Sequence, residues 1–208
     1  MSRYPTRAWR SFDPQRGSAA APPPPPPPVL AAERTGLRVL GLDPGSRITG
    51  FGLIEWRDGR WCHVAHGCIA VPGAEALAVR VRLIFERLTE LIAQHDPAEV
   101  AVERVFVNRN VDSALKLGQA RGAALCAVPH GVTVFEYAPR AIKLALVGSG
   151  AAEKQQVAHM VRALLSLQER LAADAADALA VALCHAHSRP MARLAAAHGA
   201  APNGSGTT

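Results

Sequence analysis

The chain has 208 residues, of which 49% are hydrophobic and 19% are charged. This length corresponds to about one to one and a half domains, and the composition suits a packed core. No apolar run approaches the ~18 residues that a membrane-spanning helix needs, and the four cysteines form no CxxC pair. These features exclude a membrane protein and a disulfide scaffold, and they predict a soluble protein of a reducing, cytoplasmic compartment.

The net charge of +6 suggests a polyanionic partner such as nucleic acid, but the charge is unevenly distributed. Residues 1–37 hold five Arg and two acids, and residues 189–208 hold two Arg and no acid. The stretch 38–188 holds 16 basic and 15 acidic residues. A polyanion would therefore be bound by local patches of the folded part rather than by its bulk charge.

Both ends of the chain have compositions that do not form a core. Residues 22–28 are seven consecutive prolines within an Arg-containing segment, and the chain ends in NGSGTT. We predict a disordered Arg/Pro-rich arm over 1–37, a folded domain over 38–188 and a disordered tail over 189–208.

The folded part begins with strands and continues with alternating helices and strands. The run 38–43 stops at Pro44-Gly45, and two further strand patterns, 49–56 and 60–71, flank an Asp-Gly turn. Apolar residues then recur at helical spacing over 76–95, before a short apolar strand at 99–103. The remaining predicted elements are a helix at 111–128, a strand at 132–137 and helices at 139–146, 153–167 and 173–187. This order predicts an α/β fold with a five-stranded mixed sheet flanked by helices.

Four acidic residues stand at the ends of these elements. Asp43 ends the first strand and Glu103 ends the fourth, while Asp174 and Asp177 begin the last helix. Three residues apart on a helix, the two aspartates lie about 60° apart on one face. Carboxylates without His or thiolate partners suit Mg²⁺ or Mn²⁺, and shared carboxylates bridging two ions are common in phosphodiester cleavage.

Each acid also has an ordinary structural interpretation. Asp174 could cap the last helix, and Asp177 could be a first-turn acid favoured by the helix dipole. Glu103 could form an ion pair with Arg104 or Arg121. From the residues alone, these interpretations remain open.

Other motifs are weaker. Cys62, His66 and Cys68 would share one face of a strand, but the two cysteines would lie about 20 Å apart, which is too far for one zinc ion. The glycine-containing segment 41–50 matches neither GxxxxGK[ST] nor GxGxxG, so a nucleotide-binding loop has little support. Lysine is rare, with Lys116, Lys143 and Lys154 against twenty Arg. A site that needs an ammonium group and retention by chance are both open interpretations of each position.

Several longer motifs carry a resemblance to a known family. The segments GLDPGSRITGFGLI, VERVFVNRNVDSALKLGQARGAAL, VFEYAPRAIKLALVGSGAAEKQQVAHMVRALL and ADAADALAVALCHAH resemble RuvC, the bacterial crossover junction endodeoxyribonucleases. The resemblance runs from about residue 38 to 187. It implies an RNase H-like fold, a homodimer, and Mg²⁺-dependent nicking of four-way (Holliday) junctions in DNA recombination and repair. The arm at 1–37 and the loop Gln168–Leu171 match no motif of the family.

The resemblance implies a role for each matched residue. The family's carboxylates fall on Asp43, Glu103, Asp174 and Asp177, which would hold two Mg²⁺ ions, with Mn²⁺ as a substitute. Its lysines fall on Lys143 and Lys154, of which one or both would neutralise charge in the transition state. The products would be 5′-phosphate and 3′-hydroxyl ends.

The resemblance also implies contacts with DNA and with other proteins. Phe106 would stack on an unpaired base at the crossover, and we expect Arg104, Arg109 and Lys116 to contact the DNA. The RuvA–RuvB branch-migration complex is the expected protein partner. Two alternatives are an RNase H-like nuclease that acts on RNA and a junction-binding module without catalysis; the four acids argue against the second.

Overall fold

The computed structural model describes the backbone of residues 36–104 and 111–199, and side chains as far as Arg189. Its strands are β1 Arg38–Asp43, β2 Ile48–Arg57, β3 Arg60–Ala70, β4 Glu99–Glu103 and β5 Thr133–Tyr137. Its helices are α1 Leu77–His95, α2 Val111–Cys126, α3 Pro139–Val147, α4 Lys154–Leu164 and α5 Ala173–Gly199. The predicted α/β fold is confirmed, with most element boundaries within three residues of those expected.

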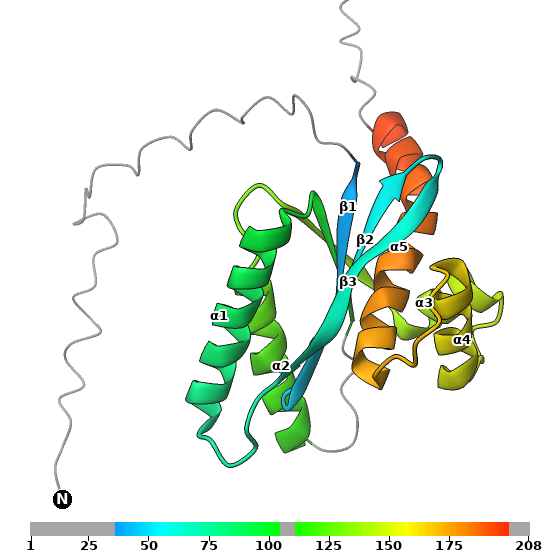
Figure 1. The fold of residues 1–208 in the computed structure, drawn as a ribbon. Helices are drawn as coiled ribbons and strands as arrows, with labels where there is room; N and C mark the ends of the chain where they lie inside the picture. Colours follow the sequence, from blue (N-terminus) through cyan, green and yellow to red (C-terminus); the bar gives the residue numbers. More distant parts are fainter. Residues whose placement is uncertain (1–35, 105–110, 200–208) are drawn as a thin grey trace, which may run out of the picture. The chain divides into compact units, whose positions relative to one another are not determined.

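The five strands form one mixed sheet in the order β3-β2-β1-β4-β5. The first three strands pair antiparallel, whereas β1–β4 and β4–β5 pair parallel. Helices α1 and α2 cover one face, and α3, α4 and α5 lie on the other (Figure 1). Because β1 and β4 are parallel neighbours, their carboxyl ends meet at the same edge of the sheet.

Successive side chains of β1 point to opposite faces of the sheet and pack into two separate hydrophobic cores. Leu40 and Leu42 pack with α1 and α2, whereas Val39 packs with α3, α4 and α5. Gly41 and Asp43 lie two and four residues after Val39 on the strand. Both positions therefore point to the same face of the sheet as Val39, the face that α5 covers. The sheet face that carries Asp43 is therefore the one that α5 covers.

Helix α5 lies against this face at backbone distance. A Cβ atom added at Gly41 would overlap the carbonyl oxygen of Ala178 and come within 2.7 Å of the amide nitrogen of Ala182. One added at Gly50, the register partner of Asp43, would overlap the carbonyl of Asp174. Glycine at these two strand positions, facing a helix rich in alanine, thus allows a close contact that a side chain at either glycine position would prevent.

Two features differ from the sequence predictions. The helix predicted to end at 187 continues to Gly199, so the tail expected to be disordered over 189–208 is helical in its first part. Its sequence from Met191 to His198 consists largely of Ala, Leu, Arg and Met, which are strong helix formers.

The second difference is a β-bulge in β3. The register with β2 shifts between Leu53 and Ile54, which leaves Val64 as the extra residue. A bulge reverses the alternation of faces beyond it. His63, rather than Cys62 as expected, therefore shares a face with His66 and Cys68, and the two histidine rings are in contact, with Nε2 of His63 2.8 Å from Nδ1 of His66.

None of the helices in the described part of the chain is long and apolar enough to cross a lipid bilayer.

The glycine contact gives a direct stability prediction. Gly41→Ala should lower the free energy of unfolding by about 1–3 kcal/mol, because the added methyl group meets helix backbone that cannot rotate away. Gly73→Ala is the matched control, since a Cβ there meets no atom within 4 Å. Denaturant unfolding monitored by circular dichroism measures both variants. Equal stability of Gly41→Ala and Gly73→Ala would contradict the close contact.

Candidate active site

The site is built at the sheet edge where β1 and β4 end. Leu42 of β1 is paired with Val102 of β4, so the next residues, Asp43 and Glu103, are neighbours across the parallel pair. Both side chains project from the face that α5 covers. The short apolar strands thus carry one carboxylate each out of the core at the same place.

The first turns of α5 supply the other two acids. The helix begins at Ala173, and the amide of Ala176 donates to the carbonyl of Ala172. Asp174 therefore lies within the first turn and is not the helix cap, which removes one of the ordinary interpretations. The contact of its carbonyl with Gly50 holds this end of α5 beside Asp43.

Two lysines face the acids from α3 and α4. Lys154, the first residue of α4, places its Nζ 2.7 Å from Oδ2 of Asp177. Glu153 and Gln156 form a capping box that fixes the start of this helix. A cavity of about 180 Å³ is lined by Glu103, Lys143, Lys154 and Asp177 together with Pro139, Ile142, Val157 and Ala180. Lys143 forms no hydrogen bond or ion pair with any residue in the described ranges.

The acids repel one another strongly. Burial, followed by the negative charges of Asp177 and Asp174, raises the pKa of Asp43 to about 6. Burial and the charges of Asp43 and Asp177 raise the pKa of Glu103 to about 7. The hydrogen bond to Asp177 raises the pKa of Lys154, which keeps this lysine protonated. The site is a cluster of partly buried carboxylates whose negative charge exceeds the positive charge of the neighbouring lysines.

This donor set fits a divalent cation in its chemistry. Carboxylate oxygens are the ligands that Mg²⁺ and Mn²⁺ prefer. Within the described ranges, however, no three Asp, Glu, His or Cys side chains converge closely enough to ligate one ion. Mutual repulsion and the Lys154–Asp177 pair account for this spread, and a cation between the acids would offset both.

The alternative partner of Glu103 is also excluded. Arg104 and Arg121 both pair with Glu136 on β5, and the guanidinium Nε of Arg104 lies 3.6 Å from that carboxylate. Arg121 reaches only the backbone oxygen of Glu103, at 3.5 Å. The Glu103 side chain is therefore left for the cluster.

Of the predicted DNA-contact residues, the structure describes only Arg104 and Lys116, and neither lines the active-site cavity. Phe106 and Arg109 lie in 105–110, outside the described residues. Arg104 is engaged by Glu136, and Lys116, on α2, forms an exposed ion pair with Asp112 at 2.6 Å. Both remain predictions as DNA contacts.

One neighbour of the site was not predicted from the sequence. Cys68 on β3 is close enough for its thiol to accept a hydrogen bond from the Ala175 backbone and to sense Asp174 and Asp43; burial is the main cause of its raised pKa. Its register partner is Gly50, which is itself paired with Asp43. Only the three-stranded register brings it there, and no sequence signal marks it.

A comparison with models of protein families identifies the family to which this chain belongs. The family model of the crossover junction endodeoxyribonuclease RuvC matches residues 39–185, which include all four acids and both lysines. The chain belongs to the RuvC family. Nucleases of this family depend in general on a divalent metal.

Individual RuvC relatives agree with this assignment. The crossover junction endodeoxyribonuclease RuvC of Halorhodospira halophila is 57% identical over 165 residues, covering 78% of this chain and 98% of the relative. The Thermus thermophilus RuvC structure has a TM-score of 0.68 and 37% identity, covering 75% of this chain and 97% of that one. The T. thermophilus RuvC in complex with a Holliday junction substrate has a TM-score of 0.67 and 35% identity, covering 74% and 96%.

The repulsion within the RuvC-family site predicts a pH-dependent stability. A carboxyl group whose pKa is raised in the folded state destabilises the fold above that pKa, and the penalty fades as the pH falls toward the unfolded value. For Glu103 this window runs from about 7 down to 4.5. In EDTA, Glu103→Gln should be more stable than the unchanged protein at pH 8, and this advantage should vanish near pH 4.5.

Denaturant unfolding across this pH range measures the effect. Glu86→Gln, which removes an exposed carboxylate on α1, is the control and should show no such pH dependence. An advantage of Glu103→Gln that is the same at both ends of the range would count against the repulsion.

Proposed function

We propose that this chain is a structure-selective endonuclease that resolves four-way DNA junctions by paired, symmetric nicks during recombination and repair. The observation that carries the proposal is the cluster of Asp43, Glu103, Asp174 and Asp177 at one sheet edge, with Lys154 against it, in a chain of the RuvC family. The decisive assay compares Mg²⁺-dependent nicking of a synthetic four-way DNA junction with that of linear DNA duplex and of an RNA junction.

The acids would hold two Mg²⁺ ions, for which Mn²⁺ would substitute. The charge of Asp43 interacts with those of Asp174, Asp177 and Glu103. Asp43 would be shared between the ions, with Glu103 on one and Asp174 and Asp177 on the other. When bound, two such ions activate the attacking water and stabilise the leaving 3′ oxygen, which gives 5′-phosphate and 3′-hydroxyl ends.

The lysines would act on the phosphate itself. Lys154 is tied to Asp177, whereas Lys143 faces the same cavity without an ion pair in the part of the chain that the structure describes. Lys143 is thus the ammonium available to a phosphate oxygen, and Lys154 becomes available if Asp177 turns to a metal ion. Positive charge placed before the reaction stabilises negative charge that develops in the transition state.

We further propose a homodimer that assembles through α2. Val111 and Leu115, one turn apart, are 67% and 62% exposed, which is unusual for large apolar side chains. The exposed Gly118 continues this stripe and allows a close approach. A two-fold dimer presents two equal sites to the two opposed strands of a junction. The RuvA–RuvB complex is the proposed partner, and the cytoplasm, where bacterial DNA lies, is the proposed location.

The carboxylates are tested by removing charge without changing shape. Asp43→Asn should reduce junction nicking by at least about 100-fold, because it removes the negative charge and one of the two carboxylate oxygens that would be shared by both ions. Binding of the junction should persist, since phosphate contacts supply most of the affinity. Asp58→Asn in the β2–β3 turn is the matched control, because asparagine accepts its left-handed backbone. Near-normal nicking by Asp43→Asn would exclude the metal assignment.

Phe106 is tested separately from the acids. Phe106→Ala should slow nicking while leaving junction affinity within a few-fold, because a stacked ring positions the crossover but neutralises no phosphate. Single-turnover nicking and fluorescence anisotropy measure the two effects. An unchanged rate together with a lower melting temperature would make Phe106 a core residue.

A further inference from the structure

A second, larger cavity adjoins the candidate active site. Its volume is about 400 Å³, and it lies between α4 and the segment that leads into α5. Its charged or titratable lining residues are Lys154, His159, Arg162, Arg170 and Asp177. Lys154 and Asp177 also line the smaller cavity that contains Glu103, so the two cavities are neighbours on either side of this ion pair. We call the larger one the α4 cavity.

The α4 cavity concentrates positive charge in a domain whose net charge is close to zero. Lys154, Arg162 and Arg170 stand against the single acid Asp177, which is already paired with Lys154. Residues 38–188 together carry only one more basic than acidic residue. The local excess is therefore a specific feature of this cavity, not a consequence of bulk charge.

Hydrogen bonds to the loop that follows α4 hold Arg162 in place. Its NH2 group donates to the carbonyl of Gln168 at 3.1 Å, and the amide of Leu167 donates to the carbonyl of Arg162 at 2.9 Å. Its Nε is buried and finds no acceptor among the described residues. Burial keeps this Nε out of reach of a ligand, so an anion in the cavity would contact the terminal N–H groups of the guanidinium.

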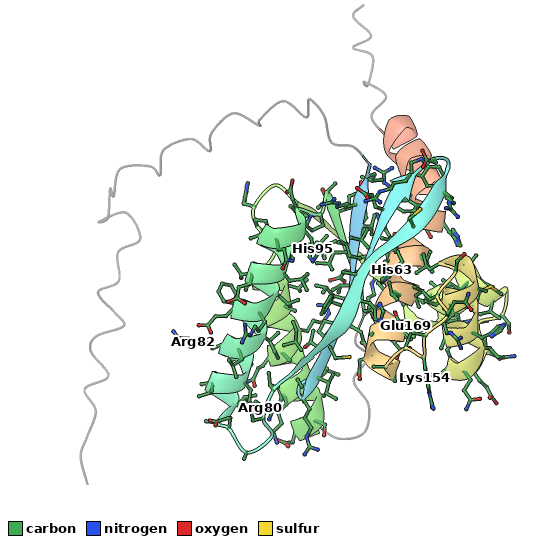
Figure 2. All side chains as sticks on the ribbon, in the orientation of Figure 1. His63, Arg80, Arg82, His95, Lys154 and Glu169 are labelled. Carbon is green, nitrogen blue, oxygen red and sulfur yellow. The ribbon has the colours of Figure 1, made fainter. Side chains whose placement is uncertain are left out.

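Arg170 supplies the second guanidinium. It is exposed and forms no ion pair or hydrogen bond with any residue of the described ranges. The neighbouring acids are engaged elsewhere, since Glu169 lies 3.8 Å from His66 and Glu153 caps α4. Figure 2 shows Lys154 and Glu169 on the α4 side of the molecule, whereas Arg82 projects from α1 on the opposite side of the sheet.

We infer that the α4 cavity binds a backbone phosphate of the junction DNA, a few nucleotides along the strand from the phosphate that is cut. The inference rests on the proposed function, and it adds Arg162 and Arg170 as residues that position the strand. Two guanidinium groups, with His159 beside them on the same lining, provide the positive charge and N–H donors that a phosphate takes. Arg170 lies in the loop that resembles no motif of the family, so its contact would be particular to this chain.

The test removes the charge on each side of the contact. A series of four-way junctions is prepared, each with one neutral methylphosphonate at a different position around the cleavage site. The affinity of the protein for each junction is measured by fluorescence anisotropy in EDTA. With the unchanged protein, one position should weaken binding by about 3- to 10-fold. With Arg170→Gln, the unmodified junction should bind more weakly, and the same methylphosphonate should weaken binding by clearly less than it does with the unchanged protein, because Arg162 remains. The slope of log affinity against log salt should fall by about 1.

Arg82→Gln, an exposed arginine on the other side of the sheet, is the control and should retain the full sensitivity to the methylphosphonate. If every methylphosphonate affects Arg170→Gln and the unchanged protein equally, the phosphate site is excluded. The binding assay does not depend on nicking. If the unchanged protein nicks the junction but shows no coupling to Arg170, this inference alone fails; if it does not nick with Mg²⁺, the proposed function fails.

Discussion

Backbone contact between α5 and the β1–β2 pair determines the geometry of the whole site. Gly41 and Gly50 leave no side chain on the sheet, and the carbonyls of Ala178 and Asp174 occupy that space. Because Gly50 is paired with Asp43, the same contact places the first turn of α5 beside the end of β1. A helix packed at an ordinary distance over larger side chains would carry its two aspartates several ångströms away from the strand carboxylates.

Bringing the acids together has an electrostatic cost that the protein offsets only in part. Lys154 pairs with Asp177, yet Asp43 and Glu103 retain raised pKa values of about 6 and 7. Two carboxylates of the neighbouring strands are each paired with two cationic or imidazole groups: Glu136 with Arg104 and Arg121, and Glu99 with Arg189 and the buried His185. Asp43 and Glu103 have no such partners among the described residues, so uncompensated negative charge gathers where a divalent cation and a phosphate are expected to meet.

Much of this could be predicted from the sequence. Apolar runs that end in Asp43 and Glu103, and two aspartates at helical spacing, already indicated one carboxylate edge. Three features could not be predicted, because they depend on contacts distant in sequence or on local irregularity. Gly41 of β1 and Gly50 of β2 look like any strand glycine until α5 is placed, the bulge at Val64 changes the face of His63, and Arg121 pairs with Glu136 only through the β4–β5 register.

The central claim is that the repulsive carboxylate cluster is a divalent-metal site. The most direct test is the dependence of unfolding free energy on Mg²⁺ concentration for the unchanged protein and for the double variant Asp43→Asn/Glu103→Gln. A cation that binds only the folded state stabilises it by about 1.4 kcal/mol for each tenfold rise in concentration above its dissociation constant. We expect this rise in stability for the unchanged protein and its loss in the double variant. An equal Mg²⁺ dependence of both proteins would contradict it.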